Sequence, residues 1–124
     1  ITTCCRNSKT YIWLEDQPVD LVVKVKEIKG TCPVYKPGDT IVIRKGYVLD
    51  TAHSATVCMH SLACLMPYYV ALSKGIHPKD LGLSGTDPDC AYVQCLDPCE
   101  ITGGGTVVFE VSVKKYMERR QGGD

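Results

Sequence analysis

The sequence lacks an excess of either charge and lacks a long apolar segment. Fourteen Lys and Arg balance fourteen Asp and Glu, so the formal net charge is zero, whereas nucleic-acid binders normally carry a clear basic excess. The longest apolar run, residues 62–72, is too short to cross a bilayer, and the first residues show no apolar signal region. We therefore expect a cytoplasmic protein that binds neither nucleic acid nor membrane.

The short cysteine spacings that mark the commonest metal and redox sites are also absent. No C-x2-C pair occurs, which excludes a zinc knuckle, a ferredoxin-type run and a thioredoxin-like site. Cysteine itself is nevertheless abundant. The eight residues are Cys4, Cys5, Cys32, Cys58, Cys64, Cys90, Cys95 and Cys99. In a secreted domain they would predict a disulfide framework, but in a reducing compartment metal binding is the better prediction, at a site assembled from separate loops.

Alternating apolar residues predict a small sheet. The expected strands cover residues 19–28, 40–44, 91–94 and 105–114. In the first, valine and leucine fall on one face, and Asp20 falls with two lysines on the other. The last alternates most regularly and is the most secure of the four.

One helix is predicted between the second and third of these strands. Ser61 can cap residues 62–74, and Gly75 is a natural stop. Pro67 either kinks this helix or begins a shorter one from Tyr68. The run is apolar nearly all round, so we expect it to be buried either against a second subunit or beneath the chain's own loops.

The fold class that follows is α+β: a small, mainly antiparallel sheet with one central apolar helix against it. A chain of 124 residues is one domain by length. We expect an N-terminal arm over residues 1–18, the domain over 19–116 and a flexible tail over 117–124.

Two pairs of residues could contribute metal ligands, because thiolate and imidazole suit Zn²⁺ in a closed tetrahedral site. Cys58 and His60 lie two apart and could face one point in an extended segment before the helix. Cys95 and Cys99 are joined by Leu-Asp-Pro, a turn sequence that could bring both thiols together.

Other cysteines have plainer interpretations. Cys64 and Cys90 can be buried small hydrophobes, which is a common fate of free cysteine. Cys4 and Cys5 can be a mobile pair without function.

Several short motifs occur in an order that resembles a known family. They are Gly30-x-Cys32-Pro33, Pro37-Gly38-Asp39, Cys58 ahead of an apolar helix with Pro67 and Gly75, and Cys95-x-Asp97-Pro98 followed by a Val-Val-Phe-Glu-Val strand. Together they resemble an uncharacterised family of small Cys-containing proteins of anaerobic bacteria and archaea. The resemblance covers residues 21–114. Pro37 replaces the family's Val before Gly-Asp, and Leu96 replaces the Pro of its C-P-D motif.

The resemblance implies that Cys32, Cys58 and Cys95 form one constellation, and antiparallel packing would bring their three loops to one end of the sheet. The pattern does not give a fourth ligand. We expect Cys99, with His60 and then Cys64 as alternatives. The sequence therefore predicts a zinc site, with an iron–sulfur cluster as the alternative.

Catalysis by this chain alone is not expected. The best candidates for a nucleophile and its base are Cys58 and His60, and their spacing is weak evidence for such a pair. The function we expect is a small, structural zinc-binding accessory subunit of a larger multi-subunit enzyme. Small zinc-bearing subunits of ATP-dependent ketone carboxylases are an analogue by class. The alternative is a stand-alone iron–sulfur or thiol redox protein of anaerobic metabolism.

Overall fold

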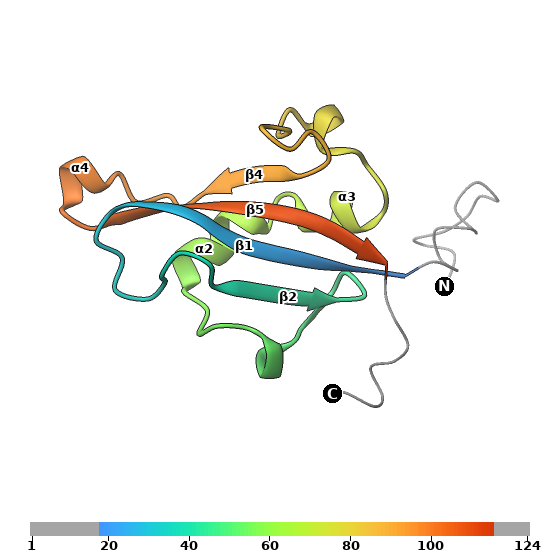
Figure 1. Cartoon of the computed structure of the whole chain (residues 1–124), viewed down its shortest axis with the longest axis horizontal. Coiled ribbons are helices and arrows are strands. Elements are labelled where there is room, and N and C mark those ends of the chain that lie inside the picture. Colours follow the sequence, from blue (N-terminus) through green and yellow to red (C-terminus); the bar gives the residue numbers. More distant parts are fainter. Residues whose placement is uncertain (1–17, 116–124) are drawn as a thin grey trace.

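A five-stranded antiparallel sheet forms the body of the molecule (Figure 1). The computed structural model describes residues 18–115. The strand order across the sheet is β3-β2-β1-β5-β4. The strands are β1 (Val19–Gly30), β2 (Thr40–Arg44), β3 (Val48–Leu49), β4 (Ala91–Gln94) and β5 (Gly105–Lys115). The predicted α+β class and the antiparallel sheet are confirmed, and β3 is an addition that its two exposed residues gave no reason to expect.

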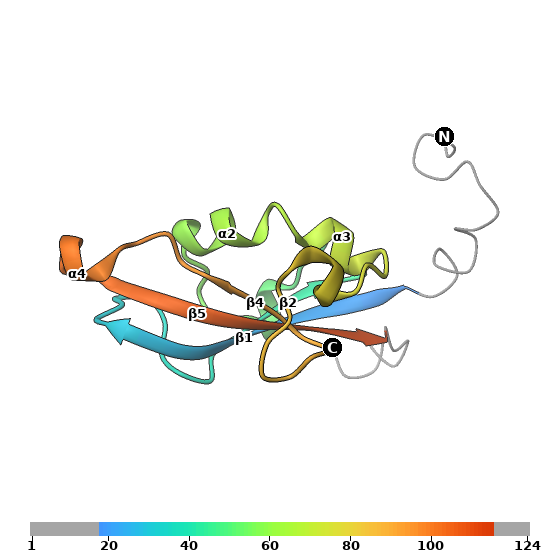
Figure 2. The same cartoon turned by 90° about the horizontal axis from the view of Figure 1, so that it is seen from above.

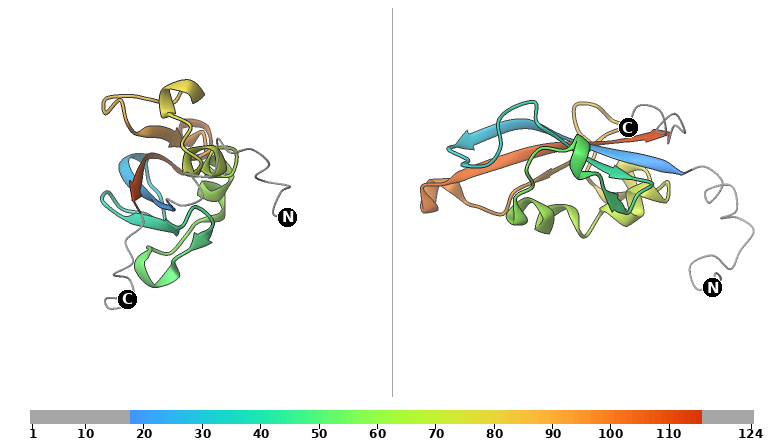
Figure 3. Two further views of the ribbon diagram at one scale, coloured as in Figure 1. Left: turned by 90° about the vertical axis from the view of Figure 1, so that its right-hand side faces the viewer. Right: turned by 90° about the horizontal axis from the view of Figure 1, so that it is seen from below.

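Short helices accompany the sheet, and α2 and α3 lie over one of its faces (Figures 2 and 3). The α-helices are α2 (Met59–Leu65), α3 (Tyr69–Ser73) and α4 (Cys99–Thr102), and the 3₁₀ turns are η3 (Thr51–His53) and η4 (Pro78–Leu81). Along residues 18–115, no helix has the length and apolar character that crossing a bilayer requires.

The single helix predicted from the sequence is two helices. Pro67 lies between α2 and α3, where its missing N–H and its ring interrupt the hydrogen-bond ladder. The first helix begins at Met59 with Cys58 at its N-cap, so the prediction that Ser61 caps it was wrong. Gly75 does follow the second helix, with a positive φ of 94° that a glycine adopts without strain.

The core lies between the sheet and the two helices. The almost fully buried residues that point into it are Leu21, Val23 and Val25 from β1 and Val107, Phe109 and Val111 from β5. Phe109 is fully buried and packs edge-on against the ring of Tyr35, with ring centroids 5.5 Å apart. This cluster reaches the end of the sheet at which β1 and β4 finish and β5 begins.

A β-bulge interrupts the pairing of β1 with β5. The register shifts between Val25, opposite Phe109, and Glu27, opposite Val108. Before the shift, odd-numbered residues of β1 face the core. After it, Ile28 packs against the core and Glu27 is exposed.

A charged network lies at the other end of the sheet. Arg44 donates to Asp20 at 2.9 Å and to Asp50 at 2.7 Å, and His53 lies 2.9 Å from Asp50. Asp20 is only 4% exposed and also accepts the backbone N–H of Lys45. The sequence placed Asp20 on the face opposite the apolar residues of its strand, and Arg44 covers it there. Burial alone would raise the pKa of Asp50, but hydrogen bonds from Arg44 and His53 outweigh burial and hold that pKa below its ordinary value.

The predicted arm and tail fall almost entirely outside the described residues, and so do Cys4 and Cys5. The first and last strands of the described residues, β1 and β5, are neighbours in the sheet.

Candidate cysteine site

Cys32 lies in the loop that follows β1, and its sulfur is held by the backbone of that loop. The N–H groups of Val34 and Tyr35 both donate to Cys32 Sγ, at 3.4 and 3.3 Å. Pro33 keeps Cys32 extended, so the chain turns back over the sulfur. Hydrogen bonds to cysteine sulfur are one of the devices by which proteins tune metal–thiolate centres.

Tyr35 occupies the middle of this end of the core. Its side chain is 5% exposed, and its hydroxyl accepts the N–H of Cys58 at 2.8 Å and contacts Ser61 Oγ at 2.6 Å. Burial raises the pKa of Tyr35 above its ordinary value, and the nearby Cys58 and Cys32 thiols add to that effect. Tyr35 is therefore neutral at physiological pH and available as a hydrogen-bond donor.

Cys58 is the residue before α2, and its thiol makes no capping hydrogen bond to the helix. The side chain is half-buried against the core. His60 lies in the first turn of α2 and is exposed. The expectation that Cys58 and His60 share an extended segment was therefore wrong, because the helix begins three residues earlier than predicted.

Cys64 and Cys95 are neighbours deeper in the core, 7% and 8% exposed. The Cys64 thiol donates to the carbonyl of Ser61 at 3.0 Å. Burial, with a smaller contribution from the adjacent Cys95, raises the pKa of Cys64 to about 11. Cys95 follows β4, and its N–H donates to the carbonyl of Val107.

Cys99 begins α4 and lies against the end of β1. Gly30 makes this approach possible: a Cβ built there would lie 3.4 Å from Cys99 Sγ and 2.3 Å from the carbonyl oxygen of Gly104. Gly30 also has a φ of 75°, which a side chain disfavours. Cys99 is half-buried.

Cys90 stands apart from the others. It precedes β4, whereas Cys95 follows that strand. Its side chain is 6% exposed, and burial raises its pKa to about 11, with Asp87 adding to the effect.

The structure brings Cys32 and Cys58 to the same tyrosine and Cys95 into the same core cluster. Cys64 joins the cluster as the neighbour of Cys95, while His60 faces away into solvent. Among residues 18–115, no three Cys, His, Asp or Glu side chains are gathered closely enough to hold a metal ion. Cysteine thiolates are chemically suitable ligands for a thiophilic metal. A closed metal site would, however, require these thiols to turn toward one another.

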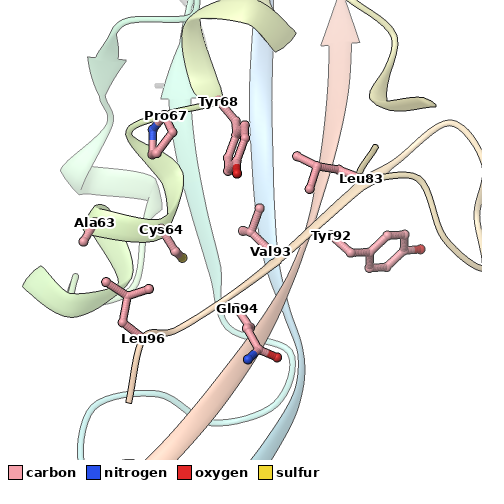
Figure 4. A pocket seen from close by; sticks show the side chains of 9 residues that line it. All are labelled: Ala63, Cys64, Pro67, Tyr68, Leu83, Tyr92, Val93, Gln94 and Leu96. Atoms are coloured by element: carbon pink, nitrogen blue, oxygen red, sulfur yellow. The ribbon is translucent and has the colours of Figure 1, made fainter. Parts of the chain in front are cut away.

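A pocket of about 300 Å³ lies next to the buried Cys64, between the α2–α3 junction and β4 (Figure 4). Cys64 lies on its wall, with Tyr68 and Leu96 on either side. The lining residues are all uncharged: Ala63, Cys64, Pro67, Tyr68, Leu83, Tyr92, Val93, Gln94 and Leu96.

Sequence reasoning did not single out Tyr35 or assign Ser61 its observed role. Tyr35 lies in a turn-rich loop where a tyrosine has no expected contact, and its partner Ser61 is 26 residues away. Ser61 stood out only as a helix cap. Its hydroxyl instead bonds back to the carbonyl of Cys58 at 2.6 Å.

The family resemblance remains a prediction that depends on the motif residues quoted above. Comparisons of the chain with models of protein families, with curated proteins and with solved structures found no match.

Proposed function

We propose that this chain is a small zinc-binding accessory subunit of a larger cytoplasmic enzyme complex. The observation that carries the proposal is the link from two predicted ligands, Cys32 and Cys58, to one buried tyrosine. A hydroxyl buried among apolar side chains is costly unless it is bonded. Here the Tyr35 hydroxyl is bonded to Cys58 and Ser61, so it fixes the segment that carries Cys58.

The ligands on this proposal are Cys32, Cys58, Cys95 and Cys99. They come from the segments that follow β1 and β4 and from the residue before α2. Zinc would supply structural cross-linking of these segments, since it carries no redox chemistry of its own. Such a site would add on the order of 10 kcal/mol to folding, by comparison with zinc-finger peptides.

The partner half of the proposal is supported by the outer surface of the two core helices. Met59, Met66 and Val70 are 76%, 60% and 51% exposed, although Leu65 and Leu72 of the same helices are buried. Large apolar side chains exposed together are a common sign of a protein interface. We infer that a larger subunit covers these three residues.

Metal analysis of anaerobically purified protein tests the proposal. We expect one zinc per chain in the wild type, loss of that zinc in Cys32→Ala and Cys58→Ala, and retention in Cys90→Ala, which removes a buried thiol away from the cluster. Full occupancy in Cys32→Ala would overturn the ligand set. Iron with sulfide, visible as a brown colour that bleaches on reduction, would favour the iron–sulfur alternative.

The partner is tested separately. Tagged wild-type protein should co-purify with larger subunits from its own cells, whereas a Met59→Glu, Met66→Glu variant should not. A wild-type chain that is recovered alone as a stable monomer would contradict the accessory role, whatever its metal content.

A further inference from the structure

The pocket beside Cys64 extends from the core to the surface. Its inner part is formed by Cys64 and Val93, which are 7% and 9% exposed, and Leu96 at its edge is 68% exposed. Its volume of about 300 Å³ is about twice the roughly 150 Å³ of an engineered apolar cavity that binds benzene. The pocket is therefore large enough for a molecule of one or two rings.

The 9 residues that line this pocket are all uncharged. The stretch of chain that supplies its helical wall, residues 51–73, contains no Asp, Glu, Lys or Arg. An ion that entered the pocket would lose its hydration without gaining an opposite charge, which is costly. The pocket therefore favours an uncharged molecule.

Two of the polar side chains in the lining are already bonded. The Cys64 thiol donates to a carbonyl of its own helix at 3.0 Å, and the Tyr92 hydroxyl donates to Glu110 at 2.6 Å. Within residues 18–115, the Tyr68 hydroxyl and the Gln94 amide have no hydrogen-bond partner. Gln94 is exposed to water, whereas Tyr68 is partly buried against the core.

Tyr68 points from the α2–α3 junction toward Val93, across the pocket (Figure 4). A tyrosine hydroxyl usually finds a hydrogen-bond partner when its ring is buried. A molecule in this pocket can supply that partner. The rings of Tyr68 and Tyr92 in the lining also favour an aromatic molecule, because aromatic rings attract one another in stacked or edge-on contacts.

We infer that this pocket binds a small, uncharged aromatic molecule of one or two rings, which forms one hydrogen bond with the Tyr68 hydroxyl. The inference goes beyond the proposed function, because the pocket is a separate site. Met59, Met66 and Val70, which we assign to the larger subunit, do not line it. Neither do the four cysteines proposed to hold zinc.

The test uses 2-naphthol as the probe and 2-naphthoate as its charged counterpart, each titrated into the full chain at neutral pH. NMR signals of the Ala63 and Val93 methyl groups report on the pocket, which both residues line. We expect saturable binding of 2-naphthol that shifts both signals, and binding of 2-naphthoate that is at least about 10-fold weaker. Equal affinity for the two probes, or no saturable binding of 2-naphthol, overturns the inference.

Tyr68→Phe tests the hydrogen bond, and Tyr69→Phe is its matched control. Tyr69 is the adjacent residue, is also partly buried against the core, and does not line the pocket. Tyr68→Phe should bind 2-naphthol about 2–10-fold more weakly than the wild type, which is the range expected for one lost hydrogen bond. Tyr69→Phe should match the wild type. Equal affinities in the two variants overturn the role of Tyr68.

Ala63→Phe tests the location by filling the pocket, and Met59→Phe adds the same ring to the same helix outside it. Both positions are exposed, so neither variant forces an aromatic ring into the core. We expect Ala63→Phe to abolish 2-naphthol binding and Met59→Phe to leave it unchanged. Binding that survives in a folded Ala63→Phe variant would place the probe elsewhere and overturn the site.

Discussion

Arg44 is the cation that holds the two carboxylates at one end of the sheet, and its replacement by methionine is a sharp test of the electrostatics. The side chains of Arg44, Asp20 and Asp50 are 19%, 6% and 14% exposed. Removing one partner of a fully buried ion pair costs about 3–5 kcal/mol, and a fully exposed pair contributes about 0–1 kcal/mol. For Arg44→Met we expect a loss of about 3 kcal/mol in the free energy of unfolding, or about 12 °C in Tm.

The pH dependence identifies the cause of that loss. The folded-state pKa of Asp50 lies below its ordinary value, so its contacts stabilise the protein above the unfolded pKa, near pH 4, and this stabilisation disappears as the pH falls through the folded pKa. The wild type loses the contribution in acid. Arg44→Met has already lost the Arg44 share of it. The difference in unfolding free energy between the two proteins should therefore shrink between about pH 7 and about pH 3.

Urea unfolding at both pH values measures the difference. Lys26→Met is the matched control, because Lys26 lies 3.7 Å from Glu110 and is 48% exposed. It should cost no more than about 1 kcal/mol. An equal gap between wild type and Arg44→Met at both pH values would refute the electrostatic explanation and leave lost packing as the reason.

Two further predictions concern the ends of the strands and the buried thiols. Gly30→Ala should lower the free energy of unfolding by about 2 kcal/mol or more, because its Cβ would meet the Gly104 carbonyl at 2.3 Å as well as adopt a positive φ. Gly82→Ala, with the same φ of 75° and open space around it, should cost only the conformational strain, about 1 kcal/mol, and equal losses in denaturant melts would count against the clash. Cys64 and Cys90, whose pKa values burial raises to about 11, should react slowly with iodoacetamide near pH 8 in the folded protein and rapidly in denaturant. Rapid labelling of either residue before unfolding, followed by mass spectrometry, would contradict their burial.

The sheet could be predicted because its signal is local. Period-two alternation in β1 and β5 depends on residues that are adjacent in the chain, and so does the break that Pro67 makes in the helix. What failed depended on partners distant in sequence. The burial of Asp20 was not predicted, because the arginine that covers it is 24 residues away.

The cysteine site divides in the same way. The topology of the strands was enough to expect Cys32 and Cys95 at one end of the sheet. The hydrogen bonds that join Tyr35 to Cys58 and Ser61 could not be predicted from the sequence, because no spacing rule links Tyr35 to a serine in α2. The start of that helix was also missed, since cysteine is not among the residues preferred at an N-cap.

The bulge in β1 acts as a frameshift within the strand. β1 has 12 residues against 11 in β5, and the extra residue inverts the order of inward and outward side chains for everything that follows it. If all twelve residues of β1 paired with β5 without a bulge, Glu27 would follow Val25 onto the inward face and Ile28 would point outward. The loop carrying Cys32 would then start from the wrong phase of the strand. The one unmatched residue of β1 therefore sets the side of the sheet from which the first cysteine loop begins.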